Sequence, residues 1–200
     1  MNSPFFAVLS RMKYINRWAL MRNTFSENIS EHSLEVAMIG HALATLGNVR
    51  LGKNINADRV ALIGIFHDCP EIITGDMPTP IKYHNEDIQH AFKDIEDSAS
   101  GMLVSMLPED MQAVYEPLFF KEEEDEYLWK LCKAADRLSA LIKCIDEEKA
   151  GNTEFSGAKD GIIERLHEMN LPEVELFEQE FLDAYYLTLD EQRSICKNIK

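Results

Sequence analysis

Four side chains of the sequence could bind one divalent metal ion: His32, the neighbouring pair His67 and Asp68, and Asp136. Two imidazoles and two carboxylates form a mixed nitrogen and oxygen set, which suits Mn, Fe, Co, Ni or Zn better than Ca. Ionised side chains without partners are costly in an apolar environment, and a buried cation would remove that cost. The ordered set therefore indicates a metal site in which some positions are left open for water.

Taken one at a time, these residues have ordinary explanations. A lone helical histidine such as His32 is more often a hydrogen-bonded core or surface residue than a metal ligand. The pair His67-Asp68 is expected by chance in many chains, and Asp136 could be a hydrogen-bonding partner between two helices. The metal interpretation therefore depends on the complete set and on the helices that would carry it.

The helix that would carry His32 is predicted to begin at Asn28 or Ser30, because Asn28 and Glu31 have the spacing of a capping box. Apolar residues then recur at helical spacing until Gly47, namely Val36, Ile39, Leu43 and Leu46. One turn before this stripe lies His32. The pattern thus predicts that His32 is on the inward face, near the start of the helix.

A second predicted helix begins after Asn56 and leads through apolar residues into His67 and Asp68. Glu71 lies one turn beyond His67 on the same face. Pro70 lacks a backbone donor and clashes with the carbonyl one turn earlier, so we expect a kink or local unwinding at this point.

Gly75 is expected to end that helical segment, and Asp76–Pro80 to form an extended, stiff loop, because a residue before proline is pushed out of the helical region. Asp136 is predicted to lie inside a long helix that starts after the acidic residues 122–126 and ends at Gly151. Further helices are expected over residues 5–14, after Asn85, after Pro108 and, as the last one, after Pro172. The inward stripe of the helix after Asn85 would hold Ile88, Phe92, Ile95, Ala99 and Met102. The last helix would place Val174, Phe177, Phe181 and Ala184 in the core. No segment alternates like a strand, so the predicted class is all-α.

The composition limits the possible partners. The 200 residues include 20 Lys and Arg against 35 Asp and Glu, a formal net charge of −15. This charge argues against binding along a nucleic acid polymer or on an anionic membrane. The length favours one domain over residues 1–200. Cysteines are widely spaced (Cys69, Cys132, Cys144 and Cys196), and neither a leader peptide nor an apolar run of about 20 residues is found, which favours a cytoplasmic protein with no membrane anchor.

The set His32, His67-Asp68 and Asp136 resembles the signature of the HD-domain superfamily of metal-dependent phosphohydrolases. The similarity extends to the bacterial 5′-deoxynucleotidase family typified by YfbR, and it is carried by Ser10-Arg11, Ile15 to Trp18, Leu20 to Asn23, Glu27-Asn28, Ser30 to Leu34, Glu71, Thr74 to Asp76 and Pro78 to Pro80. It covers nearly the whole chain. Cys69-Pro70 departs from the family pattern, in which small helix-compatible residues are expected before Glu71. The resemblance implies an HD-domain bundle of about seven or eight helices that forms a homodimer.

The resemblance also implies an activity, the hydrolysis of deoxyribonucleoside 5′-monophosphates to deoxynucleosides and phosphate with one divalent metal ion, Co²⁺ or Mn²⁺. The implied metal ligands are His32, His67, Asp68 and Asp136, with Asp68 also at the catalytic centre and in contact with substrate. Arg17 would orient the phosphate in a catalytic role, and Trp18 would shape the sugar pocket against a 2′-hydroxyl. Asp76, Met77, Pro78 and Thr79 would hold the nucleoside, and Glu71 would be the acid or base.

Elementary chemistry supports these roles but also offers alternatives to them. A planar guanidinium matches phosphate oxygens better than an ammonium, and a carboxyl one turn from the ligands could transfer a proton. Equally, Arg17 could form a surface ion pair, Trp18 a core anchor, Glu71 a solvated residue and Asp76 a turn. Two other functions also remain open: a dNTP triphosphohydrolase or cyclic-nucleotide phosphodiesterase of the same superfamily, and a non-catalytic helical scaffold stabilised by metal.

Overall fold

A computed structural model describes residues 2–82 and 84–197, and within these ranges the regular structure is helical. The α-helices are α1 (Phe5–Leu9), α2 (Ile29–Leu51), α3 (Ala57–Phe66), α4 (Glu71–Thr74), α5 (Thr79–Lys82), α6 (Glu86–Ser105), α7 (Glu109–Tyr115), α8 (Glu126–Lys149), α9 (Ser156–His167), α10 (Pro172–Phe181) and α11 (Leu189–Lys197). Short 3₁₀ segments lie at Ser10–Tyr14, Glu116–Leu118, Glu123–Asp125, Thr153–Phe155 and Leu182–Tyr186. The prediction of an all-α fold is confirmed.

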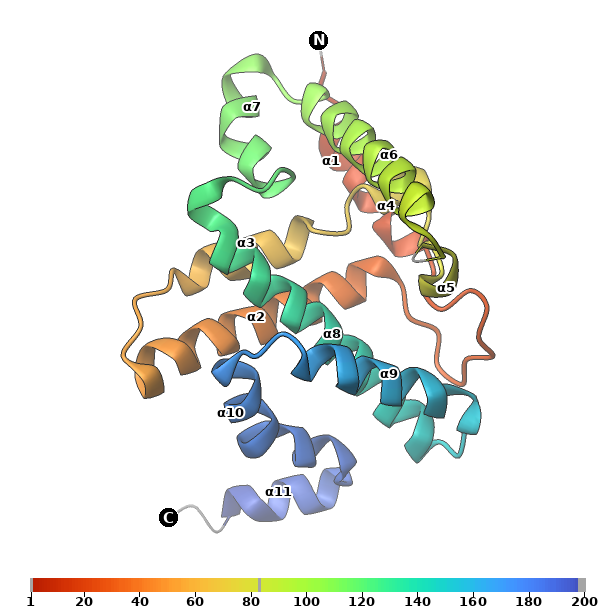
Figure 1. Ribbon diagram of the computed structural model, residues 1–200, viewed down its shortest axis with the longest axis vertical. Coiled ribbons are helices and arrows are strands. Elements are labelled where there is room, and N and C mark those ends of the chain that lie inside the picture. The colour runs from red at the N-terminus through yellow and green to blue at the C-terminus, as the bar shows by residue number, and fades with distance from the viewer. Residues whose placement is uncertain (1, 83, 198–200) are drawn as a thin grey trace.

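Helices α2, α3 and α8 pack against one another in the middle of the molecule (Figure 1). Together with α9 and α10 they enclose the larger hydrophobic cluster, in which Leu43, Ile63 and Leu138 are fully buried. A second cluster joins α1, α6 and the segment around residues 115–120, with Phe5 and Leu103 at its centre. His67 and Asp68 lie in the turn after α3, between Ile63 of the first cluster and Cys69 of the second.

The start of α2 agrees with the prediction, whereas its end does not. Asn28 accepts hydrogen bonds from the backbone N–H groups of Ser30 and Glu31, which completes a capping box. The helix continues past Gly47 to Leu51 and ends where Gly52 adopts a left-handed φ of 67°. Gly47 instead lets side chains pack directly against the helix backbone, since a Cβ there would lie 2.7 Å from Ile55 Cδ1 and 2.8 Å from Glu173 Oε1.

The break at Pro70 is confirmed: α3 ends at Phe66, a turn follows, and α4 begins at Glu71. Gly75 ends α4 with a φ of 73°. The expected extended loop is wrong for its last two residues, because Thr79 and Pro80 form the first turn of α5. Proline is tolerated there since the first turn leaves its N–H groups unpaired, and the Pro78 carbonyl accepts from residues 81 and 82.

The outer helices differ more from the sequence expectation. On α6 the buried side includes Phe92, Ala99 and Leu103, whereas Ile95 and Met102 are more than half exposed. After Pro172, Val174 and Phe177 are buried, but Phe181 and Ala184 are exposed. Neither α9 nor α11 was predicted. Helices at the rim of a bundle contact the core over a narrow strip, so their apolar residues do not identify the buried face.

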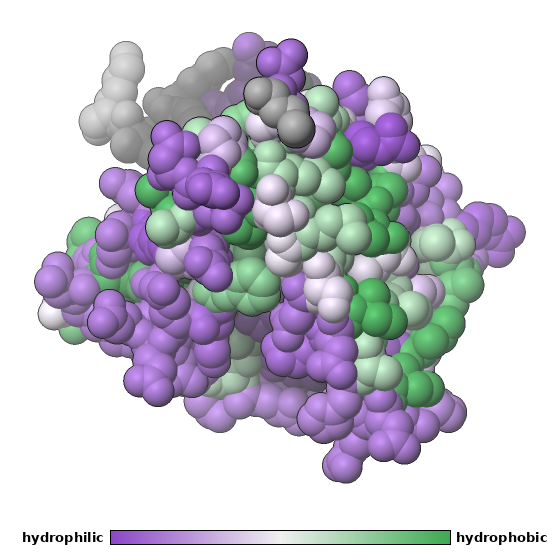
Figure 2. All heavy atoms as spheres, turned by 90° about the horizontal axis from the view of Figure 1, so that it is seen from above, coloured by the Kyte–Doolittle hydropathy of each residue, from purple (hydrophilic) through white to green (hydrophobic). Residues whose placement is uncertain are grey.

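Seen from the end where α1, α6 and α7 lie, the surface is a mixture of polar and apolar patches (Figure 2). Within the described ranges, no helix combines the length and the apolar character that crossing a bilayer requires. Cys69, Cys132 and Cys144 are buried free thiols. The side chain of Cys196, the fourth cysteine of the sequence, lies outside the described residues.

Candidate active site

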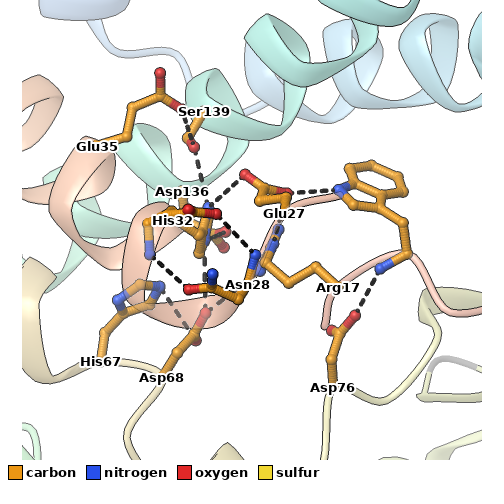
Figure 3. Close-up of polar contacts among 12 residues, drawn as sticks. Arg17, Glu27, Asn28, His32, Glu35, His67, Asp68, Asp76, Asp136 and Ser139 are labelled. Carbon is orange, nitrogen blue, oxygen red and sulfur yellow. Dashed lines mark hydrogen bonds and ion pairs between the residues drawn. The ribbon is translucent and has the colours of Figure 1, made fainter. Parts of the chain in front are cut away.

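The four predicted metal ligands lie together: His32 on α2, Asp136 on α8, and His67 and Asp68 in the turn after α3 (Figure 3). His32 of α2 is fully buried, and its Nε2 atom is 3.4 Å from Asp68 Oδ2 and 3.2 Å from Asp136 Oδ1 of α8. His67 Nε2 is 3.1 Å from the other Asp68 oxygen. One ligand atom from each of His32, His67 and Asp68 fits within a distance of 4.8 Å. Asp68 thus lies next to both imidazoles, and Asp136 lies next to His32.

A glycine allows α2 and α3 to come this close. A Cβ on Gly64 would lie 2.9 Å from the Ala37 Cα atom of α2, a backbone atom that cannot move aside as a flexible side chain could. The Gly64 carbonyl also accepts a hydrogen bond from His67 Nδ1 at 2.8 Å. Gly64 therefore sets the distance between the helices and also orients one imidazole.

The two imidazoles present atoms suited to binding a cation. Because a carbonyl can only accept, His67 carries its hydrogen on Nδ1 and directs the Nε2 lone pair at Asp68. In His32, Nδ1 lies 3.0 Å from the Ser139 hydroxyl, so Nε2 again faces the carboxylates. Both Nε2 atoms are buried and make no hydrogen bond with the described residues. Buried lone pairs without donors, next to carboxylates, are what a bound divalent cation would satisfy.

The charges of the cluster are consistent with a cation site. Burial would raise the pKa of Asp68, but His67 and His32 outweigh it and lower this pKa. Burial also opposes ionisation of Asp136, but its pKa lies well below the usual value because of Lys133, at 2.6 Å, and His32. Both carboxylates are therefore anionic. The neighbouring carboxylate of Asp68 overcomes burial and raises the pKa of His67, so protons compete with a cation for its Nε2.

An irregular loop places Arg17 and Trp18 over the start of α2. It is closed by an antiparallel bridge between Asn16 and Asn28 and by a hydrogen bond from the Arg17 N–H to the Glu27 carbonyl. The Arg17 side chain, largely buried, donates to Glu27 Oε2 at 3.2 Å and to Asp68 Oδ2 at 3.4 Å. Burial opposes its charge, but the surrounding carboxylates raise the pKa of Arg17 further, so it stays cationic.

Trp18 connects this loop to Asp76. Its backbone has a left-handed φ of 60°, unusual for a bulky residue, and its N–H donates to Asp76 Oδ2 at 3.0 Å. The indole Nε1 donates to the same Glu27 oxygen that binds Arg17, at 2.9 Å. Of the other residues predicted to hold the nucleoside, Met77 and Pro78 are half-buried next to Asp76 and Thr79 is exposed.

Glu71 is buried at the start of α4, and its Oε2 atom has no hydrogen-bond partner among the described residues. Burial, with the nearby charges of Asp68 and Asp76, raises the pKa of this carboxyl to about 10. Glu71 is therefore protonated at neutral pH. A buried neutral carboxyl next to ionised ones is a suitable proton donor.

Sequence reasoning assigned no role to three residues that hold this site in place. Glu27 binds both Arg17 and Trp18, whereas Ser139 and Glu35 form a hydrogen-bonded chain to His32. Glu27 lies in a loop without periodicity, and Ser139 is one small residue on the buried face of α8. Glu27 was among the residues that carry the family resemblance but received no role, and Glu35 lies one turn after His32 on α2.

The chain resembles known proteins along most of its length. Residues 4–185 match the model of a family described as 5′-deoxynucleotidase YfbR-like. A 5′-deoxynucleotidase of Erwinia tasmaniensis is 46% identical over 190 residues, covering 95% of this chain and 96% of the relative. The 5′-deoxynucleotidase YfbR of Escherichia coli O1:K1 is 46% identical over 189 residues, covering 94% and 95%.

Solved structures with little sequence identity have the same fold. An HD-domain phosphohydrolase from Listeria innocua superposes with a TM-score of 0.79 at 22% identity, over 90% of this chain and 87% of that one. An HD phosphohydrolase of cyanophage S-2L, bound to dA and one catalytic Zn²⁺ ion, superposes with a TM-score of 0.65 at 17% identity, over 89% and 96%. Both comparisons support the HD-domain architecture.

Proposed function

Because the chain belongs to the YfbR-like family of 5′-deoxynucleotidases, we propose that it hydrolyses deoxyribonucleoside 5′-monophosphates to deoxynucleosides and phosphate in a metal-dependent reaction. One observation carries the proposal: two buried imidazole nitrogens without donors face two ionised carboxylates, next to a buried arginine. Residues 1–200 would then form a single HD-type catalytic domain.

The residues that would hold the cation are His32 and His67, through Nε2, together with Asp68 and Asp136. A divalent ion bound there would supply Lewis-acid chemistry, polarising a phosphoryl oxygen and making water more acidic. The family resemblance favours Co²⁺ or Mn²⁺, whereas the cyanophage HD phosphohydrolase binds a catalytic Zn²⁺. The nitrogen and oxygen donors suit all three ions, so the metal should be identified by reconstitution.

The substrate would lie between the cluster and the loop that carries Arg17. The contacts with Glu27 and Asp68 use two of the five N–H donors of Arg17, and the others would bind phosphate oxygens. Trp18, next to Arg17, would lie against the sugar and exclude a 2′-hydroxyl. Asp76 uses one oxygen for the Trp18 N–H, and its other oxygen would accept a hydrogen bond from the 3′-hydroxyl. The base of the nucleotide would lie against the residues that follow Asp76, which are Met77, Pro78 and Thr79.

Glu71 would act as the general acid. Its carboxyl is protonated at neutral pH, and loss of the deoxynucleoside as an alcohol requires a proton on the departing 5′-oxygen. When the P–O bond to that oxygen breaks, the bonding electrons stay on oxygen and the Glu71 proton neutralises it. Water supplies the oxygen that forms the new P–O bond. One of its protons returns to the Glu71 carboxylate and restores the acid, and the other stays on the product, which leaves as hydrogen phosphate.

The test is phosphate release from dAMP and from AMP, with Mn²⁺, Co²⁺ or Zn²⁺ added to the EDTA-treated protein. We expect release from dAMP, little from AMP, and none in Asp68→Ala, whereas Asp94→Ala on the exposed side of α6 should match the wild type. Equal turnover of AMP would contradict the specificity for deoxynucleotides. Tripolyphosphate released from dGTP would indicate a triphosphohydrolase instead. A protein that EDTA destabilises but that hydrolyses no phosphoester would be a scaffold.

We further propose a homodimer and a cytoplasmic location. The family resemblance implies the homodimer, and light scattering should then give twice the mass of 22.9 kDa of one chain. A cytoplasmic location is supported by the buried free thiols, which a reducing compartment preserves. Fractionation of cells that produce the protein would test it.

A further inference from the structure

A chain of three hydrogen-bonding groups ends on the imidazole of His32 (Figure 3). The His32 Nδ1 atom lies 3.0 Å from the Ser139 hydroxyl, and this hydroxyl lies 2.6 Å from Glu35 Oε2. His32 and Ser139 are both fully buried, the first on α2 and the second on α8. Glu35 follows His32 by one turn, so the chain leaves α2, reaches α8 and returns to α2.

We infer that Ser139 and Glu35 are positioning residues that hold His32 in the tautomer with its hydrogen on Nδ1. Ser139 donates its single hydrogen to Glu35 Oε2, at 2.6 Å. The hydroxyl oxygen can then only accept from His32, which places the imidazole hydrogen on Nδ1. The Nε2 lone pair is left facing Asp68 and Asp136. This inference rests on the proposed function, in which Nε2 binds the metal ion.

The second imidazole shows why such a device is needed. The backbone carbonyl of Gly64 fixes the hydrogen of His67 on Nδ1, and a carbonyl cannot reverse its role. A hydroxyl can donate as well as accept, so Ser139 alone would allow either tautomer of His32. The carboxylate of Glu35 removes that choice. Two different groups thus select the same tautomer at the two imidazoles.

The tautomer that the chain excludes would compete with metal binding. With its hydrogen on Nε2, His32 could donate to Asp136 Oδ1, which lies 3.2 Å away, and the imidazole and the carboxylate would pair with each other.

Glu35, at the other end of the chain, is partly buried. Burial raises the pKa of its carboxyl, although the hydrogen bond from Ser139 opposes the shift. Glu35 also lines an open cavity of about 240 Å³, where water can reach its carboxylate. The direction of the chain is set by its geometry, in which the Ser139 hydroxyl donates to Glu35 Oε2 at 2.6 Å.

The direct test is the ¹⁵N chemical shifts of the imidazoles in metal-free protein at pH 8, with EDTA removed by dialysis. In the wild type, we expect His32 and His67 to carry hydrogen on Nδ1. In Ser139→Ala, His32 should shift toward the Nε2–H tautomer, whereas His67 should not change. Ser100→Ala, which removes another buried serine hydroxyl on α6, is the matched control.

Metal affinity gives a second readout, by calorimetric titration with Mn²⁺. We expect Ser139→Ala and Glu35→Ala to weaken binding by about 10- to 100-fold, as loss of groups that orient a ligand usually does. Glu35→Gln keeps an oxygen that accepts from Ser139 and should weaken binding less than Glu35→Ala. Circular dichroism would verify that each variant is folded.

Two results would overturn the inference: a wild-type His32 with hydrogen on Nε2, or a folded Ser139→Ala that keeps both the Nδ1–H tautomer and the wild-type Mn²⁺ affinity. Failure of the proposed function looks different. If the wild type binds none of Mn²⁺, Co²⁺ and Zn²⁺ and hydrolyses no dNMP, the metal site is wrong, while a tautomer that changes in Ser139→Ala would still support the role of the chain.

Discussion

The Glu71 carboxyl is protonated in the folded protein at neutral pH, and this makes the free energy of unfolding depend on pH. Burial raises its pKa from 4.5 to about 10, so the folded state binds more protons than the unfolded state between these values. Stability must then fall as pH rises through this interval. In metal-free protein, the wild type should therefore lose stability between pH 5 and pH 8, whereas Glu71→Gln should not. We expect the unfolding free energy of Glu71→Gln, relative to the wild type, to increase by about 1–3 kcal/mol over this range, and its melting temperature to rise accordingly.

Calorimetry in EDTA at the two pH values measures this difference. Glu168→Gln changes an exposed carboxylate and is the control, for which we expect no such trend. A gap that stays constant or narrows with pH would show that Glu71 is ionised in the folded protein. The same Glu71→Gln variant should reduce kcat for dAMP by about 10²–10⁴-fold, the usual contribution of a general acid.

Glu27 is the residue on which both Arg17 and Trp18 depend. One oxygen of its carboxylate accepts from Arg17 Nε and from the indole N–H of Trp18. Glu27→Ala should therefore lower kcat/KM for dAMP by about 10- to 100-fold, the effect of losing a hydrogen bond to a charged group. It should also narrow the preference for dAMP over AMP, because the indole loses its anchor.

Glu27→Gln separates geometry from charge. A glutamine oxygen can accept both hydrogen bonds, so this variant should keep the dAMP preference and lose only part of the rate. Steady-state kinetics on both nucleotides measures the two effects. An alanine variant with weaker activity but an unchanged preference would show that Trp18 does not depend on Glu27.

Among the elements, α8 does more than carry Asp136: it also holds the loop with Arg17 in place. Near the C-terminal end of α8, Glu147 accepts from the N–H groups of Thr24 and Phe25, at 2.9 and 3.1 Å. Lys143 donates to the Phe25 carbonyl and to Glu147. Asn152 donates to Glu147 at 2.8 Å. Helix α8, which carries Asp136, thus also fixes the position of a loop without regular structure.

Removing this anchor should loosen the loop. Glu147→Ala should raise KM for dAMP and speed amide hydrogen exchange over residues 19–26. It should also cost about 3–5 kcal/mol of stability, because the buried ammonium of Lys143 loses the carboxylate of Glu147, the anion that balances its charge. The double variant Lys143→Met with Glu147→Leu should regain much of that stability without restoring KM. If KM recovers with stability, the anchor has no role in positioning Arg17.

The elements also show what local rules can and cannot predict. Asn28, Pro70 and Gly75 act through their own backbone neighbours, so the start of α2, the break before α4 and its end were predicted from sequence. Gly47 depends on Ile55 and Glu173 packing against it, which no local pattern contains. The metal set was visible because its residue types are costly in apolar stripes. Glu27 instead acts on residues nine and ten positions away in the sequence, and Ser139 acts on another helix.

At the scale of the whole molecule, the site forms where the two hydrophobic clusters meet. α2, α3 and α8 belong to the larger cluster, and Cys69, next to Asp68, belongs to the other. Residues 17, 32, 68 and 136 come from distant parts of the sequence and meet only when both clusters are formed. The site is therefore a property of the complete fold, and segments that contain the motifs would not bind metal by themselves.

The net charge of −15 limits how many phosphates a substrate of this molecule can carry. A cation and Arg17 would provide positive charge over a few ångströms. The charge of the rest of the molecule is mostly acidic, and at physiological salt its effect is screened beyond about 8 Å.

A 5′-phosphorylated oligodeoxynucleotide would place its other phosphates against that acidic surface. We expect it to be neither hydrolysed nor an effective competitor of dAMP, and kcat/KM for dAMP to change by less than about threefold between 50 and 200 mM salt. A protein that contacts 6–10 phosphates loses about 10³–10⁵-fold in affinity over the same range. Efficient competition by the oligonucleotide, weakened by salt, would show a polymer-binding surface that the charge argues against.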